Sequence, residues 1–479
     1  MKKNKLIGRL NECKRLDTCM KADLAQLVIV YGRRRVGKTF LINQYFDNQF
    51  ALKVTGIYGK SKDVQLTNFI ASINEVSKKQ YEYVKNWFEA FRVLKDYTKT
   101  LSKMKKQVFF FDEMPWMDNK KSDFLSAFEW FWNDYASTVD NFVFIVCGSA
   151  TSWMNEKIAN NKGGLFNRQT CRLYLKPFNL YEVELYLRMK GISWTRYDIS
   201  ECYMIMGGIP YYLSLLDSEL SLKQNIDKLF FANNGELWDE FNHLYRTLFV
   251  NSDDYIKVVS VLSEKIGGMT RTELIEKTDL SSGGELTKII DNLVLSGFVR
   301  ISGFYKKKKR DARYQLADYY SLFYFRFIEK HYGKDEHYWT KASDNPGFRV
   351  WAGLSFEQVC KDHISQIKEK LGIASVLTTE SVWYTTEDED KGISGAQIDL
   401  LIDRRDHVVS LCEIKYSMNL FGIDKKYDMN LRNKIESFRK CSECKKSIQL
   451  VFITGYGLKE GKYNSLVSNS VTFEDLFRP

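Results

Sequence analysis

The segment Gly32–Thr39 reads GRRRVGKT and fits the pattern G-x-x-x-x-G-K-S/T, which is typical of loops that bind a nucleoside triphosphate. Gly32 and Gly37 let backbone N–H groups point inward, and the following helix N-terminus adds partial positive charge. Lys38 is expected to reach the β and γ phosphates, and Thr39 is expected to bind Mg²⁺ through its hydroxyl. The segment therefore predicts an ATP-binding loop.

Two further apolar segments end in polar side chains that could complete this site. Residues 108–111 are followed by Asp112 and Glu113, and residues 142–147 are followed by Gly148 and Ser149. At the end of a strand, Asp112 would hold Mg²⁺ and Glu113 would polarise the attacking water. We predict that Ser149 senses the γ-phosphate. An acidic strand-end cap and a turn or N-cap serine are the structural alternatives.

A second set of chemically capable residues lies near the C-terminus. Segments 397–403 and 408–415 are predicted to form a hairpin that sets Asp399 opposite Glu413. Because strand side chains alternate, Glu413 and Lys415 share one face, so two carboxylates and an ammonium converge. Hard carboxylate oxygens suit Mg²⁺ or Mn²⁺. An ordinary exposed Glu-Lys strand pair is the alternative interpretation.

The residues of the expected ATP site can be brought together by an α/β fold. The fully apolar segment 142–147 is typical of a parallel sheet that is covered on both faces. Residues 180–251 form amphipathic helices with few breakers, which suits a helical lid over a nucleotide. Its aromatic and methionine residues, such as Tyr203, Met204 and Met206, are interpreted as core.

A basic hairpin follows three predicted helices between residues 255 and 316. Five consecutive cations, Lys306–Arg310, lie between two strand-like segments. This order resembles a winged helix-turn-helix, whose basic tip neutralises phosphates of DNA. A solvated hairpin and a protein-contact module are the alternatives. Two capping boxes mark helix starts, Thr270-x-x-Glu273 and Ser282-x-x-Glu285.

Composition limits the class of protein. The 479 residues suggest about three or four folded domains, since 44% are hydrophobic and 15% aromatic. A net charge of +11 favours a polyanionic partner such as nucleic acid. No apolar run approaches a membrane span and the first residues lack a signal-peptide core, so we expect no membrane partner and a cytoplasmic location. Nine scattered cysteines argue against a disulfide framework.

The chain resembles, essentially end to end, archaeal and bacterial P-loop ATPases of the AAA-like, STAND-related group that carry a winged helix and a nuclease-like C-terminal domain. Beyond the Gly32–Thr39 loop, the motifs that carry this resemblance are Ile7-Gly8-Arg9, Asp112-Glu113, Gly148-Ser149, Gly163-Gly164-Leu165-Phe166-Asn167-Arg168 and Gly207-Gly208-Ile209-Pro210.

The resemblance implies further roles. It implies adenine contacts from Gly8, Arg9 and Pro210, and it makes Arg168 a candidate arginine finger or sensor, acting in cis or from a neighbouring subunit of a homo-oligomer. Asn167 stands where a glycine is expected. A surface salt-bridge arginine is the alternative for Arg168.

The spacing of Asp399, Glu413 and Lys415 resembles the PD-(D/E)xK restriction-endonuclease-like superfamily. By that resemblance Asp399 and Glu413 bind metal, and Lys415 orients or activates the hydrolytic water. Glu357, near the start of an expected helix over 354–371, adds an outer metal contact. The metal would stabilise charge on the phosphodiester transition state.

Four parts are therefore expected: a P-loop ATPase domain (1–179), a helical lid (180–251), a winged helix (252–330) and an α/β restriction-endonuclease-like domain (345–479). The predicted function is Mg²⁺-dependent ATP hydrolysis coupled to DNA binding, extending to DNA cleavage if the C-terminal carboxylates are active. The alternatives are a slow STAND-type nucleotide switch whose C-terminal domains only bind partners, and a DNA-binding module without cleavage.

Overall fold

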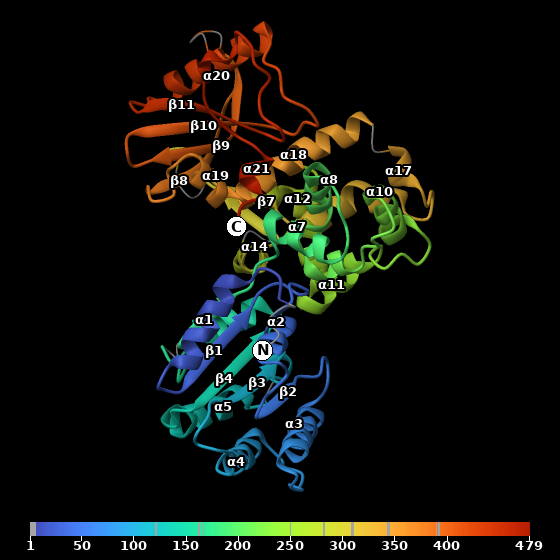
Figure 1. Cartoon of the computed structure of the whole chain (residues 1–479), viewed down its shortest axis with the longest axis vertical. Helices are drawn as coiled ribbons and strands as arrows, with labels where there is room; N and C mark the ends of the chain where they lie inside the picture. The colour runs from blue at the N-terminus through green and yellow to red at the C-terminus, as the bar shows by residue number, and fades with distance from the viewer. Residues whose placement is uncertain are drawn as a thin grey trace. The chain divides into compact units, whose positions relative to one another are not determined.

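The computed structural model describes residues 6–119, 122–160, 163–165, 167–249, 251–280, 283–307, 311–342, 345–388, 390 and 393–479. The chain divides into two compact units, Met1–Pro177 and Phe178–Pro479 (Figure 1). Each unit contains a five-stranded sheet of its own. Among the described residues, no helix has both the length and the apolar character needed to cross a membrane.

The first unit is built on a parallel sheet in the order β2-β3-β4-β1-β5. The strands are β1 (Gln26–Tyr31), β2 (Leu52–Thr55), β3 (Gln107–Asp112), β4 (Phe142–Gly148) and β5 (Cys171–Tyr174). Every residue of β4 is buried, as expected for a strand covered on both faces. β4 lies between β1 and β3, so the ends of these three strands meet at one edge of the sheet.

Helices cover both faces of this sheet. The helical segments are α1 (Leu10–Lys21), α2 (Lys38–Tyr45), α3 (Lys62–Ser77), α4 (Trp87–Thr98), η1 (Met114–Trp116), α5 (Phe124–Asp134), η2 (Ala136–Thr138), α6 (Thr151–Trp153) and η3 (Met154–Ala159). Residues of α1 and α2 pack on one face, and residues of α3, α4 and α5 pack on the other.

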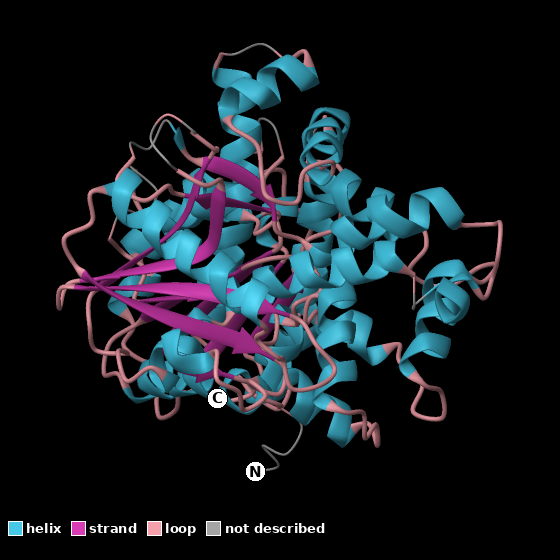
Figure 2. Cartoon of the chain, turned by 90° about the horizontal axis from the view of Figure 1, so that it is seen from above, coloured by secondary structure: helices cyan, strands magenta, loops and turns pink. Residues whose placement is uncertain are grey.

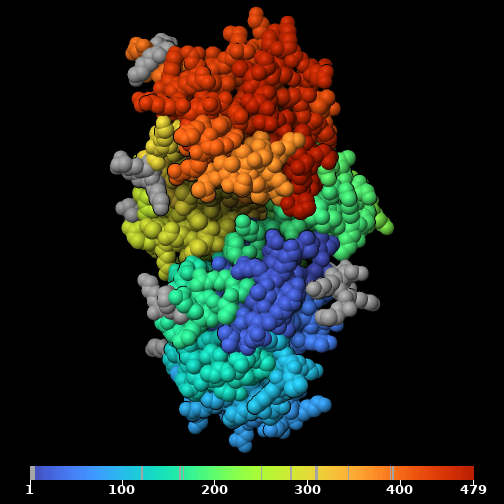
Figure 3. All heavy atoms as spheres, turned by 60° about the vertical axis from the view of Figure 1, so that its left-hand side comes forward, coloured from blue at the N-terminus to red at the C-terminus, as the bar shows by residue number. Residues whose placement is uncertain are grey.

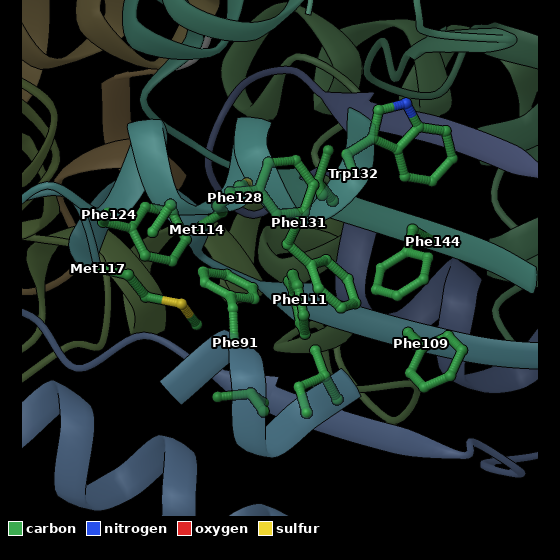
Figure 4. Close-up of a cluster of buried hydrophobic side chains, with 14 of the residues drawn as sticks. Phe91, Phe109, Phe111, Met114, Met117, Phe124, Phe128, Phe131, Trp132 and Phe144 are labelled. Atoms are coloured by element: carbon green, nitrogen blue, oxygen red, sulfur yellow. The ribbon is translucent and has the colours of Figure 1, made fainter. Parts of the chain in front are cut away.

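The face under α4 and α5 is filled by aromatic rings (Figure 4). Phe109 of β3 and Phe144 of β4 are register partners, and their rings stack with centroids 4.4 Å apart. Phe91 of α4 stacks on Phe131 of α5 at 5.3 Å. Such large buried rings contribute most of the apolar area that holds the helices to the sheet.

The second unit begins with a helical region. Its segments are α7 (Leu180–Met189), α8 (Arg196–Met206), α9 (Pro210–Ser214), α10 (Leu222–Ile226), η4 (Asp227–Phe231) and α11 (Glu240–Leu248). Asn179 and Glu182 form a capping box that starts α7. Tyr203, Met204 and Met206 are buried in this region, which confirms their interpretation as core.

Three helices and a hairpin follow in the expected order. They are α12 (Ser252–Ser263), α13 (Arg271–Thr278), α14 (Gly284–Leu295), β6 (Val299–Ser302) and β7 (Arg313–Leu316). The Thr270–Glu273 capping box is present at the start of α13. Ser282 of the other expected box lies outside the described residues. The chain then continues through α15 (Tyr319–Phe323), η6 (Tyr324–Ile328), α16 (Glu329–His331) and α17 (Tyr338–Ala342).

The C-terminal sheet has the order β12-β11-β10-β9-β8 and mixes antiparallel and parallel pairs. Its strands, magenta in Figure 2 among cyan helices, are β8 (Thr378–Thr385), β9 (Ala396–Arg404), β10 (Val408–Lys415), β11 (Ser447–Thr454) and β12 (Val467–Val471). The helical segments around it are α18 (Pro346–Asp362), α19 (Ile364–Lys370), α20 (Lys425–Ser442), η7 (Asn464–Leu466) and α21 (Phe473–Leu476).

The expected single helix over 354–371 is wrong. The structure has two helices, α18 and α19, which meet at His363. The buried imidazole accepts a hydrogen bond from the Leu180 N–H at 2.9 Å, and its other ring nitrogen lies 2.8 Å from the Val359 carbonyl oxygen. Burial lowers the pKa of His363. Glu357 therefore lies in the C-terminal half of α18, not near a helix start.

Candidate functional site

The Gly32–Thr39 loop joins the end of β1 to the start of α2. Gly32 has φ 144°, and a Cβ added there would lie 2.4 Å from the Leu175 carbonyl oxygen. Gly37 has φ 87° and is the N-cap of α2. Both conformations disfavour side chains, so the two glycines of the motif are required by the backbone path.

Lys38 and Thr39 lie at the start of α2 and contact the loop and the end of β3. The buried Lys38 ammonium donates to the carbonyl oxygens of Gly32 at 3.0 Å and Arg33 at 2.9 Å. The Thr39 hydroxyl lies 3.1 and 2.9 Å from the two carboxylate oxygens of Asp112, the last residue of β3. The loop and the acidic strand end thus form one polar site.

Ser149 and Glu113 are in direct contact. The Ser149 hydroxyl lies 2.9 and 2.8 Å from the Glu113 carboxylate oxygens, and its N–H donates to the same carboxylate at 3.0 Å. The N-cap of α6 is Ala150, so Ser149 is not the helix cap. Glu113 adopts φ 46°, and its N–H donates to Asp112 at 3.1 Å. The turn after β3 therefore aims Glu113 toward β4.

The segment before α1 reaches the same loop. Gly8 and Arg9 both have positive φ, 62° and 55°. The Arg9 guanidinium is buried and donates to the Val36 carbonyl oxygen at 3.1 Å. Pro210 is the first residue of α9 in the second unit. The adenine contacts expected of Gly8, Arg9 and Pro210 stay a prediction.

Arg168 lies on a tight turn. Its N–H donates to the Leu165 carbonyl oxygen at 3.1 Å, and its side chain is exposed. Asn167 has φ 53°, so it adopts the left-handed conformation for which a glycine was expected. Phe166 lies outside the described residues. The role of Arg168 at the γ-phosphate stays a prediction.

Comparison with known proteins bears on this site. Residues 6–216 match the family described as an ATPase domain predominantly from Archaea. This match supports ATP binding and ATPase activity. An uncharacterized protein of Methanocaldococcus jannaschii is 24% identical over 417 residues, which cover 86% of this chain and 87% of the relative.

Similar solved structures include a Walker-type ATPase of Pyrococcus abyssi, with 15% identity, TM-score 0.49 and coverage of 68% of this chain and 97% of that chain. The ORC2 protein of Aeropyrum pernix has 13% identity and TM-score 0.45, and the match covers 68% of this chain and 94% of that chain. A STAND protein with a tetratricopeptide repeat sensor from Pyrococcus horikoshii has 16% identity and TM-score 0.30, and the match covers 77% of this chain and 52% of that chain.

Beyond the ATPase domain, the structure brings the C-terminal residues together. β9 and β10 pair antiparallel through Leu400 and Cys412, so the next residues along the two strands are Asp399 and Glu413. α18, which carries Glu357, packs against both strands. In Figure 3 the orange segment that includes α18 lies against the red C-terminal atoms.

Glu413 is surrounded by donors. Its carboxylate accepts from Tyr427 at 2.5 Å and Lys434 at 2.6 Å, and Lys415 lies at 3.1 Å. Burial alone would raise the pKa of Glu413, but the ammonium groups of Lys434 and Lys415 outweigh burial and lower it. Sequence reasoning missed Tyr427 and Lys434. Their spacing of seven residues along α20, two helical turns, was the available signal.

Glu357 behaves differently from Glu413. Burial, followed by the neighbouring Asp399 carboxylate, raises the pKa of Glu357 to about 8. Asp399 accepts from the Gln397 amide at 2.5 Å. The described residues contain no group of three acidic, histidine or cysteine side chains arranged to hold a metal ion. The expected metal role of Asp399, Glu413 and Glu357 stays a prediction, and Glu413 contacts Lys434, Tyr427 and Lys415 in this structure.

The first lysine of the basic hairpin tip has partners within the chain. The Lys306 ammonium donates to the carbonyl oxygens of Ser442 at 2.9 Å and Glu443 at 3.4 Å, at the C-terminal end of α20. A lysine there is stabilised by the helix dipole. The adjacent Tyr305 is packed in the core of the C-terminal sheet. Lys306 is thus not a free phosphate ligand, while residues 308–310 lie outside the described part of the chain.

Proposed function

We propose that the ATPase domain hydrolyses ATP with the residues at the ends of β1, β3 and β4. The buried ammonium of Lys38 and the inward-facing loop fit a triphosphate, because both supply positive charge in a site shielded from water. Thr39 and Asp112 fit Mg²⁺, since a hydroxyl and a carboxylate are hard oxygen ligands. A bound Mg²⁺ would neutralise charge on the phosphates.

Glu113 and Ser149 would complete the reaction centre. Glu113 would orient and polarise the attacking water as a general base. The two hydrogen bonds from Ser149 would hold the Glu113 carboxylate in one orientation. In this proposal Ser149 is a positioning residue that acts through Glu113.

We further propose that the nucleotide state controls binding of DNA by the second unit, with cleavage at the Asp399, Glu413 and Lys415 cluster. The observation that carries this proposal is the convergence of these residues on neighbouring strands, next to Glu357. The net charge of +11 and the order of α12, α13, α14 and the β6–β7 hairpin, which resembles a winged helix, are consistent with a nucleic-acid partner. As built, the cluster does not fit a resident metal ion, so cleavage would require Lys434 to release Glu413.

The test is incubation of the purified full chain with linear and supercoiled DNA and Mg²⁺ or Mn²⁺, with and without ATP. Lys415→Ala should abolish cleavage, whereas Lys426→Ala, an exposed lysine of α20, should retain it. Lys38→Ala shows whether ATP controls the reaction. Absence of cleavage with either metal would exclude the nuclease proposal.

The second candidate is a slow STAND-type nucleotide switch that binds partners without cleaving DNA. One observation favours it: the Glu413 carboxylate is already neutralised by two lysines. This candidate expects ATP-dependent binding of DNA or protein with unchanged DNA length on a gel. Cleavage that is lost in Lys415→Ala would exclude it.

A further inference from the structure

A pocket of about 150 Å³ lies beside Asp399 in the second unit. Three segments that are distant in sequence build it: the β6 strand, the C-terminal end of α18 with the start of α19, and the paired strands β8 and β9. The β6 side is fixed to β8, because the Val382 N–H donates to Gly303 at 3.0 Å and the Tyr305 N–H donates to Val382 at 3.1 Å. The pocket is thus a feature of the packed unit.

Three residues that line this pocket carry unpaired donors. The Nη1 atom of Arg300 and the hydroxyl of Ser381 are buried and have no hydrogen-bond partner among the described residues. Ser381 is only 9% exposed. Lys361 makes no hydrogen bond or ion pair with any part of the chain that the structure describes; burial lowers its pKa more than the neighbouring Glu357 carboxylate raises it. Buried donors without partners cost stability unless a ligand satisfies them.

The carboxylates of Glu380 and Asp399, which line this pocket, and of the neighbouring Asp362 each already contact a donor of the chain. Glu380 contacts Lys368 at 2.5 Å, and Asp399 accepts from Gln397 at 2.5 Å. Asp362 accepts from the Nη2 atom of Arg300 and, at 2.6 Å, from Tyr319. The unsatisfied capacity is therefore that of a guanidinium, an ammonium and a hydroxyl, which together suit an anion with several acceptor oxygens.

We propose that Arg300, Lys361 and Ser381 bind a phosphate group, and that it belongs to a nucleic-acid strand. That the phosphate belongs to a nucleic-acid strand rests on the proposed DNA function. That the pocket binds a phosphate group does not depend on that function. Asp399 lines the same pocket, so a strand anchored there by one phosphate would pass beside the Asp399–Glu413 cluster. A free phosphate ion presents the same acceptor oxygens to these three residues and is the alternative ligand.

The test is calorimetric titration of the full chain in EDTA, which prevents cleavage. All proteins carry Lys38→Ala, so that the ATP loop does not bind phosphate. The probes are a short oligonucleotide with a 5′-phosphate, the same oligonucleotide with a 5′-hydroxyl, and inorganic phosphate. We expect Lys361→Gln to weaken oligonucleotide binding about tenfold, because a hydrogen bond to a charged group is lost.

Two variants keep the proposal falsifiable. Ser381→Ala should weaken binding several-fold while leaving the melting temperature unchanged or raised, because it removes an unpaired buried hydroxyl. Arg349→Gln, an exposed residue of the same helix as Lys361, should bind like the parent. These results do not depend on cleavage, so they test the phosphate site independently of the nuclease proposal.

The outcomes are distinct. Stronger binding of the 5′-phosphorylated probe identifies a strand end, and equal binding of both probes identifies an internal phosphodiester. Binding of inorganic phosphate alone, still sensitive to Lys361→Gln, retains the site but makes a free anion its ligand. Binding that is the same in the parent, Lys361→Gln and Ser381→Ala would overturn the proposal.

Discussion

The ATP site and the C-terminal carboxylate cluster both place acidic side chains at or near the ends of sheet strands, but they balance the charge differently. In the ATP site, Asp112 accepts from the Thr39 hydroxyl and Glu113 accepts from Ser149, which are neutral donors. In the cluster, Glu413 contacts the ammonium groups of Lys415 and Lys434.

This difference separates two kinds of site. Carboxylates that are held by neutral donors can offer their oxygens to a divalent cation without first losing a cationic partner. A carboxylate that already has two ammonium partners must lose one of them before a cation can bind. In the proposed ATP site Mg²⁺ would therefore displace no ammonium group from Asp112 or Glu113, whereas in the cluster its binding would require a rearrangement of Lys434.

The largest effect is expected at the ATP site from Lys38→Ala. Removal of the buried ammonium should abolish ATP binding and turnover, because Lys38 is the motif lysine that is expected to reach the β and γ phosphates. Nucleotide-binding calorimetry and a phosphate-release assay measure this effect. Lys62→Ala, at the start of α3, is the matched control. Parent-like turnover in Lys38→Ala would refute the assignment of the ATP site.

Glu113→Gln should separate binding from chemistry. The amide keeps the shape of the side chain but is not a base, so turnover should fall by at least about 100-fold while ATP still binds. Single-turnover measurements with pre-bound ATP report the chemical step. A variant that hydrolyses ATP at the parent rate would show that Glu113 is not the base.

Ser149→Ala tests whether neutral donors are important in the ATP site. The variant loses the hydroxyl contact to Glu113 but retains the backbone N–H contact, so kcat should fall about tenfold with little change in ATP affinity. A steady-state titration of ATP distinguishes kcat from KM. The double variant Glu113→Gln/Ser149→Ala should have the same kcat as Glu113→Gln alone. This result would confirm that Ser149 acts through Glu113.

Lys434→Met tests the opposite charge balance in the cluster. Freeing one Glu413 oxygen should tighten binding of Mn²⁺ about tenfold, since an ammonium no longer competes with the cation. Mn²⁺ electron paramagnetic resonance without ATP, in the Lys38→Ala chain, measures this affinity. Lys426→Met controls for net charge. Unchanged Mn²⁺ affinity would show that Lys434 does not block a metal site.

Glu357→Gln should give the smallest effect, on the pH dependence of stability. The pKa of Glu357 is about 8 in the folded chain and 4.5 in the unfolded reference. The folded state therefore binds more protons, and stability falls as pH rises from about 4.5 to about 8. The variant should not show this fall, which makes it at least about 1 kcal/mol more stable than the parent above pH 8.

Chemical denaturation at pH 5 and pH 8.5 measures this difference. Glu369→Gln, an exposed residue of α19, should follow the parent at both values. If Glu357→Gln followed the parent as well, Glu357 would be ionised in the folded chain, and the contrast with Glu413 would disappear.

Local sequence patterns predicted the elements that carry the ATP site. The loop glycines, the apolar strands and their polar ends depend on contacts within a few residues, and the structure places Lys38, Thr39, Asp112, Glu113 and Ser149 in one site. The β9–β10 hairpin was likewise predictable, because alternation and a short connection set its register. The break at His363 was not, since it depends on a hydrogen bond from Leu180, far away in sequence.

The sequence by itself determined where the candidate chemical groups lie along the chain: the phosphate loop, the acidic strand ends and the Glu413-x-Lys415 pair. Only the tertiary structure decided their charge states and partners. Tyr427 and Lys434 reach Glu413 from α20, and Lys306 binds the end of that helix instead of remaining free. The physical reason is that burial and the charge of neighbouring groups depend on packing between elements, which local patterns do not specify.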